Sequence, residues 1–222
     1  TGAEEAAATA PELDAAITAK VDALVKAQMD ELGVPGVAVG IVKDGTVVYA
    51  KGFGVTNLDG GAPVTPQTVF QWAETSMTPT AMAVLQLVEQ GKIDLDAHVT
   101  EYLPYFTMAD PRYKDITVRM LLSHRSGLPD TAGYWDVPLD PTVNPLEQAV
   151  RWVADKQLLF EPGTDWAYSD KNYAALGAII AAVTGKQFET YMQEEWLTPL
   201  GMTHSTFVLG DVDPAQRVAI YD

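Results

Sequence analysis

The side chains best suited to chemistry lie in two short segments of this 222-residue chain. The first is FQWAETSMTPT at residues 70–80, a turn that carries Glu74 into the start of a helical pattern. The second is EPGTDWAYSDKN at residues 161–172, a turn that presents Tyr168 and Asp170. Carboxylates and phenols can move protons when their surroundings shift their pKa values. Each segment is therefore a candidate to carry site residues.

The common patterns for nucleophiles and metal ligands are missing from the sequence. No Ser is followed by Lys three residues later, and there is no Gly-x-Ser-x-Gly motif. The chain has no Cys, and its three His lie far apart at positions 98, 124 and 204. Glu74 and Asp170 could hold a hard cation, but no clustered His supports a zinc or iron site. We expect no metal and no cofactor, and we expect His124 to be a hydrogen-bonded structural residue.

Hydrophobic spacing predicts the elements that position these segments. Helices are expected over 12–32, 81–90, 146–156, 173–184 and 188–196, and strands over 37–42 and 46–53. Ser76 or Thr78 could cap the helix that follows Glu74, and Pro79 suits its first turn. Lys43-Asp44-Gly45 is a hairpin turn. A two-stranded hairpin is marginal alone, so we expect it to pack on the 12–32 helix or to pair with further strands.

Composition excludes two classes of partner. The chain has 30 acidic and 14 basic residues and a net charge of −16, so nucleic acid would be repelled. No apolar run is long enough to span a membrane. We expect a disordered segment at 1–11, the helix and hairpin of an α/β part at 12–66, and a mostly helical part bearing a cleft at 67–222.

Five stretches, in this order, resemble the beta-lactamase-related serine hydrolases, which include class C beta-lactamases, penicillin-binding DD-peptidases and esterases. They cover nearly all of residues 34–207: VPGVAVGIVKDGTVVYAKGFG, the segment around Phe70 with VLQLVEQGKIDLDAHVTEYLP, ITVRMLLSHRSGLPD, EPGTDWAYSDKNYAALGAIIAAVTG and TPLGMTHSTF. The resemblance implies an α+β fold, with an antiparallel sheet flanked by helices, a helical subdomain and a cleft between them. It also implies a secreted or periplasmic location.

The chain departs from the family at the motifs that do the chemistry. The family's Ser-x-x-Lys motif supplies a nucleophile and a base, and the resemblance puts Glu74 and Met77 at those positions. The family's Tyr-x-Asn motif corresponds to Tyr168 and Asp170. Its third motif, a Lys or His before Thr/Ser-Gly on a later strand, is not found. We therefore expect the C-terminal strands to be absent, or supplied by a second chain or dimer partner.

Two hypotheses follow for function. The first is an inactive relative, natural or deliberately disabled, that keeps a cleft for a small ligand or acts as a scaffold. The second is an enzyme with altered chemistry that uses Glu74 as a general acid or base on a small ester, amide or other substrate. If the family fold is kept, Glu74 converges with Tyr168 and Asp170.

The resemblance also suggests neighbours for that cleft. Trp72 and Met77 could take Glu74 out of water and raise its pKa. We expect Trp72, Trp135 and Lys171 as candidate ligand contacts, with Trp135 at the rim. For Lys171 a solvated side chain is the simpler expectation.

Overall fold

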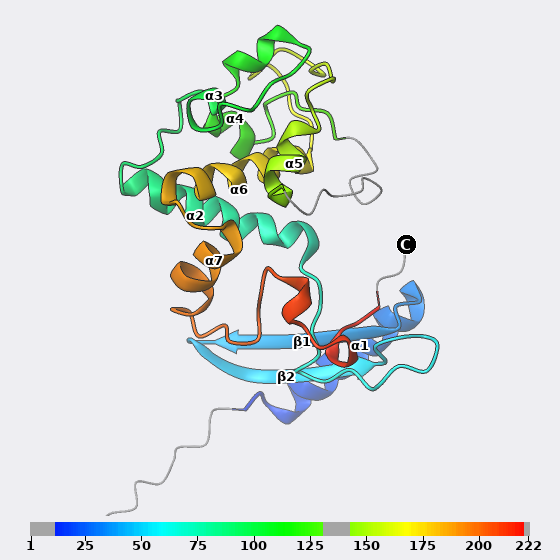
Figure 1. The fold of residues 1–222 in the computed structure, drawn as a ribbon. Helices are drawn as coiled ribbons and strands as arrows, with labels where there is room; N and C mark the ends of the chain where they lie inside the picture. Colours follow the sequence, from blue (N-terminus) through cyan, green and yellow to red (C-terminus); the bar gives the residue numbers. More distant parts are fainter. Residues whose placement is uncertain (1–11, 131–142, 220–222) are drawn as a thin grey trace, which may run out of the picture. The chain divides into compact units, whose positions relative to one another are not determined.

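A computed structural model describes residues 12–130 and 143–219 (Figure 1). The described residues form two compact units, one of residues 12–71 with 208–219 and the other of residues 72–207. This grouping differs from the expected division because it places residues 67–71 and 208–219 in the first unit. The segment predicted to be disordered, 1–11, and the predicted contact Trp135 lie outside the described residues.

The first unit is built on a helix and a hairpin. Helix α1 (Ala15–Leu32) begins where the Asp14 carboxylate accepts hydrogen bonds from two backbone N–H groups, and it ends at the left-handed Gly33. Strands β1 (Gly36–Lys43) and β2 (Thr46–Gly54) are antiparallel, with Lys43 opposite Thr46. The two residues between them have positive φ, 50° at Asp44 and 75° at Gly45, as a tight hairpin turn requires.

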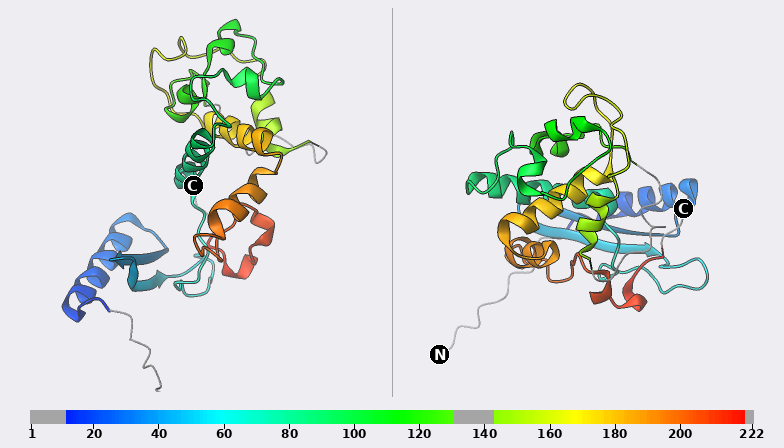
Figure 2. Two further views of the ribbon diagram at one scale, coloured as in Figure 1. Left: turned by 90° about the vertical axis from the view of Figure 1, so that its left-hand side faces the viewer. Right: turned by 45° about the horizontal axis from the view of Figure 1, so that its top comes forward.

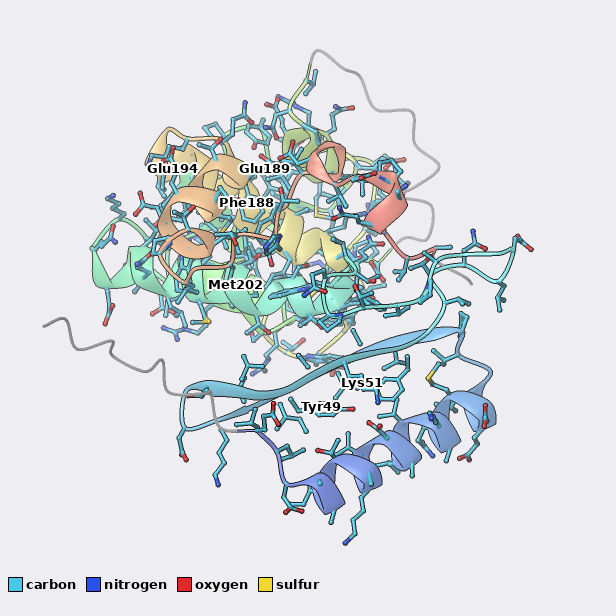
Figure 3. All side chains as sticks on the ribbon, turned by 90° about the horizontal axis from the view of Figure 1, so that it is seen from below. Tyr49, Lys51, Phe188, Glu189, Glu194 and Met202 are labelled. Carbon is cyan, nitrogen blue, oxygen red and sulfur yellow. The ribbon has the colours of Figure 1, made fainter. Side chains whose placement is uncertain are left out.

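The hairpin packs on α1, which confirms one of the two expected arrangements. Figure 3 shows Tyr49 and Lys51 on the α1 side of β2, where both donate to Asp22: the phenol at 2.6 Å and the ammonium at 2.5 Å. Burial and the Asp22 carboxylate raise the pKa of Tyr49 to about 12. Short 3-10 turns at Leu209–Asp211 and Pro214–Gln216 complete this unit.

The second unit is helical within the described residues. A 3-10 turn, η1 (Ala73–Ser76), leads into α2 (Met77–Glu89). The later elements are α3 (Val99–Tyr102), a 3-10 turn at Pro111–Asp115, α4 (Val118–Leu122), α5 (Pro145–Arg151), α6 (Asp170–Thr184), α7 (Phe188–Met192) and a π-helical turn at Gln193–Leu197.

Helix α6 is the centre of this unit. It contacts α2, α3, α4, α5 and α7 (Figure 2). Leu176, Ile179 and Ile180 of α6 are fully buried, as are Val84 and Leu87 of α2. Because α2 and α6 share one core, the segments that precede them in the chain are carried on a packed base.

The ends of the helices differ from the sequence prediction. Helix α2 starts at Met77 rather than residue 81, with Pro79 in its first turn as expected. Ser76 stands at the N-cap position, but its hydroxyl makes no capping bond and donates instead to the Ala73 carbonyl at 2.6 Å. Helix α6 starts at Asp170 rather than residue 173. No helix among the described residues has the length and apolar character needed to cross a membrane.

Candidate functional site

Glu74 and Met77 lie at the entrance to α2. Ala73 has a φ of 44°, a left-handed conformation that is uncommon for a residue with a side chain, so the chain turns sharply just before Glu74. Glu74 is in η1 and Met77 is the first residue of α2. Residues three apart on a helical turn are neighbours, so the two side chains start from the same side.

Glu74 is open to solvent at this entrance. Its side chain is exposed, Trp72 is 46% exposed, and Met77 is half-buried. The expectation that Trp72 and Met77 remove Glu74 from water is therefore wrong. The local turn is held by bonds among its own residues: the Thr75 N–H donates to the Trp72 carbonyl at 3.0 Å and the Ser76 hydroxyl donates to the Ala73 carbonyl at 2.6 Å.

Tyr168 and Asp170 meet at the start of α6. The Tyr168 hydroxyl donates to the Asp170 carboxylate at 2.6 Å. Ser169, between them, is buried and caps α6 by accepting from the Lys171 N–H at 3.2 Å. The Asp170 N–H donates to the Asp130 carboxylate at 3.2 Å, which brings a further acid to the same place.

A ladder of backbone hydrogen bonds fixes the turn that carries Tyr168. The N–H groups of Ala167 and Gly163 donate to the carbonyls of His124 and Arg125, at 3.0 and 2.8 Å. The Leu159 N–H donates to the Gly127 carbonyl at 2.8 Å. Gly127 has a φ of 79° and a Cβ there would lie 2.7 Å from a backbone oxygen, so this close approach requires glycine.

The electrostatics link Tyr168 to three acids. Burial, the hydrogen bond to Asp170, and the negative charges of Asp170, Glu74 and Asp130 all raise the pKa of Tyr168 well above its usual range. The phenol is therefore a protonated donor at neutral pH. The structure thus joins Tyr168 to Asp170 directly, and it brings Glu74 close enough for its charge to act on the phenol.

His124 packs against Tyr168 inside this turn. The two rings stack with centroids 5.0 Å apart and an interplanar angle of 30°. Asn172 Nδ2 lies 3.0 Å from His124 Nδ1, and Ser126 Oγ donates to Asn172 Oδ1 at 2.6 Å. His124 is hydrogen-bonded, as expected. Sequence reasoning did not find Ser126 and Asn172, although both are polar residues set among apolar ones, in SGL and KNYAAL.

Lys171 is not solvated, which corrects the simpler expectation for this residue. It is 2% exposed, and its ammonium lies 4.9 Å from the centre of the Trp152 ring. Burial lowers the pKa of Lys171, while the charges of Asp170 and Asp130 oppose that shift. A lysine held in this way acts on its surroundings as a buried cation rather than as an exposed anion contact.

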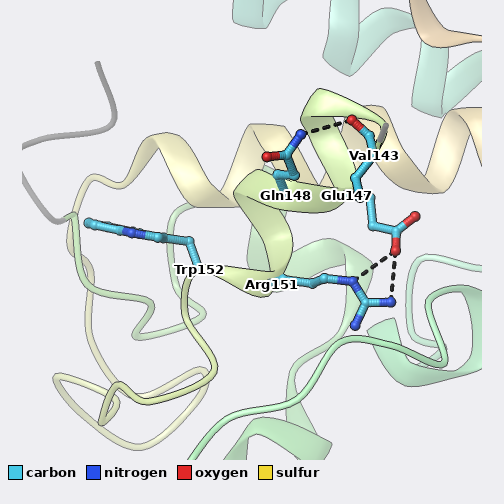
Figure 4. Close-up of a pocket in the computed structure, with 5 residues that line it drawn as sticks. All are labelled: Val143, Glu147, Gln148, Arg151 and Trp152. Carbon is cyan, nitrogen blue, oxygen red and sulfur yellow. Dashed lines mark hydrogen bonds and ion pairs between the residues drawn. The ribbon is translucent and has the colours of Figure 1, made fainter. Parts of the chain in front are cut away.

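A separate pocket lies on α5, with a volume of about 510 Å³ (Figure 4). Its lining residues are Val143, Glu147, Gln148, Arg151 and Trp152. Arg151 pairs with Glu147 at 2.7 Å within α5, so these two charged residues of the pocket wall neutralise each other. Among the described residues, no group of three or more His, Asp or Glu is placed to hold a metal ion.

Comparison with known proteins gives consistent matches over most of the chain. The family model for beta-lactamase matches residues 21–222. Protein flp of Staphylococcus aureus strain N315 is 31% identical over 189 residues, which are 85% of this chain and 38% of that protein. Esterase EstB of Burkholderia gladioli is 31% identical over 217 residues, which are 90% of this chain and 54% of the esterase.

Solved structures agree with the sequence matches. The octameric penicillin-binding protein homologue from Pyrococcus abyssi is 30% identical, with a TM-score of 0.74 over 93% of this chain and 47% of that one. The expected α+β fold of this group is therefore confirmed. The chain spans about half or less of the length of the proteins it matches.

Proposed function

Because this chain belongs to the beta-lactamase family of serine hydrolases, we propose that it is a member without acyl-serine chemistry, and that it uses its site to bind a small ligand. The observation that carries the proposal is the pair of side chains at the entrance to α2. Glu74 lies in η1 and Met77 begins α2, and by the resemblance of the sequence motifs they correspond to the family's nucleophilic Ser and its Lys.

Neither side chain can do the work of the residue it replaces. A carboxylate that attacks an ester or lactam forms an anhydride, which is a poor resting intermediate. The thioether of Met77 has no proton to give or take. Removal of a nucleophile and its base leaves only the rate that binding and fixed dipoles provide.

The state of Tyr168 supports the same proposal. Its hydroxyl already donates to Asp170 at 2.6 Å, and its raised pKa keeps it protonated at neutral pH. A phenol in this state can orient a ligand by accepting a hydrogen bond from it, but it is a poor base. The site is thus better suited to binding than to activation of a nucleophile.

The test is covalent labelling of the full chain with a fluorescent penicillin and with a fluorophosphonate, read by intact mass. We expect no adduct on the unmodified chain. The double variant Glu74→Ser/Met77→Lys restores the motif, and Glu74→Ala/Met77→Ala controls for the loss of the native side chains. A stoichiometric adduct on the unmodified chain would overturn the proposal, whereas an adduct on the Ser/Lys variant alone identifies a disabled hydrolase.

A second candidate function is acid–base catalysis by Glu74, with Tyr168 and Asp170 in support. One observation favours it: the charge of Glu74 acts on the phenol of Tyr168 together with that of Asp170. Groups coupled in this way can exchange protons with a substrate. Hydrolysis of a panel of small esters and amides decides the matter, since Glu74→Gln should abolish any such turnover.

We also propose that the sheet of the first unit pairs with further strands, from another part of the protein or from a second copy. The described residues form a two-stranded sheet, which is marginal by itself. Val42 and Val47 are 64% and 56% exposed, so apolar surface remains to be covered. Sedimentation of the 222-residue chain tests this: a stable monomer with no tendency to associate would argue against it.

A further inference from the structure

The protonation state of His124 can be deduced from its neighbours. The backbone N–H of Ser169 points at His124 Nδ1 at 3.3 Å, and a backbone N–H can only donate. Nδ1 must therefore be an acceptor without a proton. The neutral ring then carries its proton on Nε2.

The same deduction orients the buried amide of Asn172. An acceptor at His124 Nδ1 requires Asn172 to present its Nδ2 donor there, at 3.0 Å. Asn172 Oδ1 then accepts from Ser126 Oγ at 2.6 Å, and Ser126 Oγ accepts in turn from the Leu128 N–H at 3.0 Å. Ser126 and Asn172 are fully buried, so water does not compete for these bonds. Each group in this series of hydrogen bonds therefore has one consistent role as donor or acceptor.

The groups that face His124 would otherwise favour its charged form. The carboxylates of Asp170 and Asp130 raise the pKa of His124, and burial, which lowers it, is the larger effect. The remaining neighbours are rings: Tyr168 at 5.0 Å, Tyr173 at 5.3 Å and Trp166 at 6.2 Å between centroids. The two donors on Nδ1 add a geometric barrier, because a proton there would face both of them.

We infer that His124 is a positioning residue, a neutral ring with its proton on Nε2 that holds Tyr168 as a protonated hydrogen-bond donor. An imidazolium stacked on the phenol would favour the phenolate, whereas a neutral ring supports the phenol without that effect. The inference rests on the proposed function only in treating Tyr168 as a ligand-facing residue.

The first test reads the unmodified chain and needs a variant only for assignment. Long-range ¹H–¹⁵N spectra of the full chain report the protonation of each imidazole nitrogen, and His124→Asn assigns the signals, because Asn tolerates the left-handed φ of 54° at this position. We expect His124 Nδ1 to stay unprotonated from about pH 8 to about pH 5.5, across the ordinary histidine pKa. A protonated Nδ1, or a titration near the ordinary value, overturns the inference.

The second test changes the donor that sets the tautomer. Asn172→Asp places a carboxylate beside Nδ1, which should protonate the ring. The new carboxylate by itself raises the pKa of Tyr168, but the cation stacked directly on the phenol should outweigh it and lower that pKa by about one unit, a tenfold change in the ionisation constant. Phenolate absorbance measures this, with a Tyr168→Phe background subtracted. Asn144→Asp is the matched control, because it makes the same change at the N-cap of α5.

The outcomes separate the inference from the proposed function. If Asn172→Asp protonates His124 and the titration of Tyr168 does not move, His124 is only structural and the inference fails. If Asn172→Asp does not fold, the spectra of the unmodified chain still decide. Penicillin labelling of the unmodified chain would overturn the proposed function and leave these spectra unchanged.

Discussion

At the start of α2, Glu74 is exposed and the turn is held by bonds among its own residues, from the Thr75 N–H and the Ser76 hydroxyl, whereas at the start of α6 buried polar side chains are hydrogen-bonded between distant segments. Ser126, Ser169 and Asn172 are fully buried there: the Ser126 hydroxyl donates to the Asn172 carbonyl oxygen and the Ser169 hydroxyl donates to the Pro129 carbonyl. This difference in burial indicates which substitutions the protein can accept without losing stability. Side chains at the entrance to α2 can be exchanged at little cost in stability, while those around α6 cannot.

The largest effect should come from the anchor of the Tyr168 turn. Asp110 is 2% exposed and accepts from the Arg112 guanidinium and from the Leu158 N–H, while Arg112 also binds Glu161 at 3.2 Å. Asp110→Asn breaks this anchor, so we expect it to lower the melting temperature most among the variants considered. Asp96→Asn, at an exposed pair with Arg119, is the matched control and should change little.

The ion pair between Asp110 and Arg112 should also make the stability of the protein depend on pH, in a direction that can be predicted. Arg112 holds the pKa of Asp110 well below its usual range. A carboxyl whose pKa is depressed by folding stabilises the protein above its unfolded pKa of about 3.9, and that contribution is lost as the pH falls towards the folded value. The melting temperature of the unmodified chain should therefore fall as the pH is lowered from 7. The Asp110→Asn variant should lack this part of the fall.

The next effect should come from the buried hydroxyl of Ser126. Ser126→Ala leaves the Leu128 N–H and Asn172 Oδ1 without their partner. A buried polar group left unpaired costs about 1–3 kcal/mol in the free energy of unfolding, measured with denaturant. Ser123→Ala removes an exposed hydroxyl that donates to the Arg119 carbonyl, and it should cost less than about 0.5 kcal/mol.

A smaller loss is expected at Tyr168. Tyr168→Phe removes the bond to Asp170, whose carboxylate is exposed and can turn to water instead. We expect a cost of about 0.5–1 kcal/mol by denaturant unfolding. A loss larger than that of Ser126→Ala would show that the phenol, and not the buried hydroxyl, holds this side of the site together.

The smallest change in stability is expected at Glu74. Glu74→Gln should shift the free energy of unfolding by less than about 0.5 kcal/mol, because the side chain is exposed. It removes a negative charge that raises the pKa of Tyr168, so that pKa should fall slightly in a phenolate titration. A Glu74→Gln variant as unstable as Ser126→Ala would contradict the expected difference in tolerance between the start of α2 and the start of α6.

The local features of the fold were predictable from the sequence because local physics decides them. Asp44 and Gly45 supply the positive φ that a two-residue turn needs, and Gly33 ends α1. The start of α2 differs from the prediction because its first turn, MTPT at residues 77–80, precedes the regular apolar spacing from which the helix was predicted. Ser76 bonds backwards to Ala73, which no propensity indicates.

The candidate site was predictable only in part. Tyr168 and Asp170 are two residues apart, so a turn that presents both could be recognised. His124, Ser126 and Asn172 come from two distant segments, and their hydrogen bonds depend on how α4 and α6 pack. The burial of Lys171 against Trp152 depends likewise on how α5 and α6 pack. No spacing within a single sequence reports such contacts.

The backbone ladder between residues 124–127 and 159–167 bears on how the protein folds. It joins segments separated by a long stretch of chain, and the entropy of closing that loop must be overcome before any of its bonds form. The helices can form locally and early, whereas the turn that carries Tyr168 has to wait for the 124–127 segment to be in place. A refolding chain should thus regain its helical signal before the tyrosine turn, and a stalled intermediate would be helical but would lack the ordered turn that carries Tyr168.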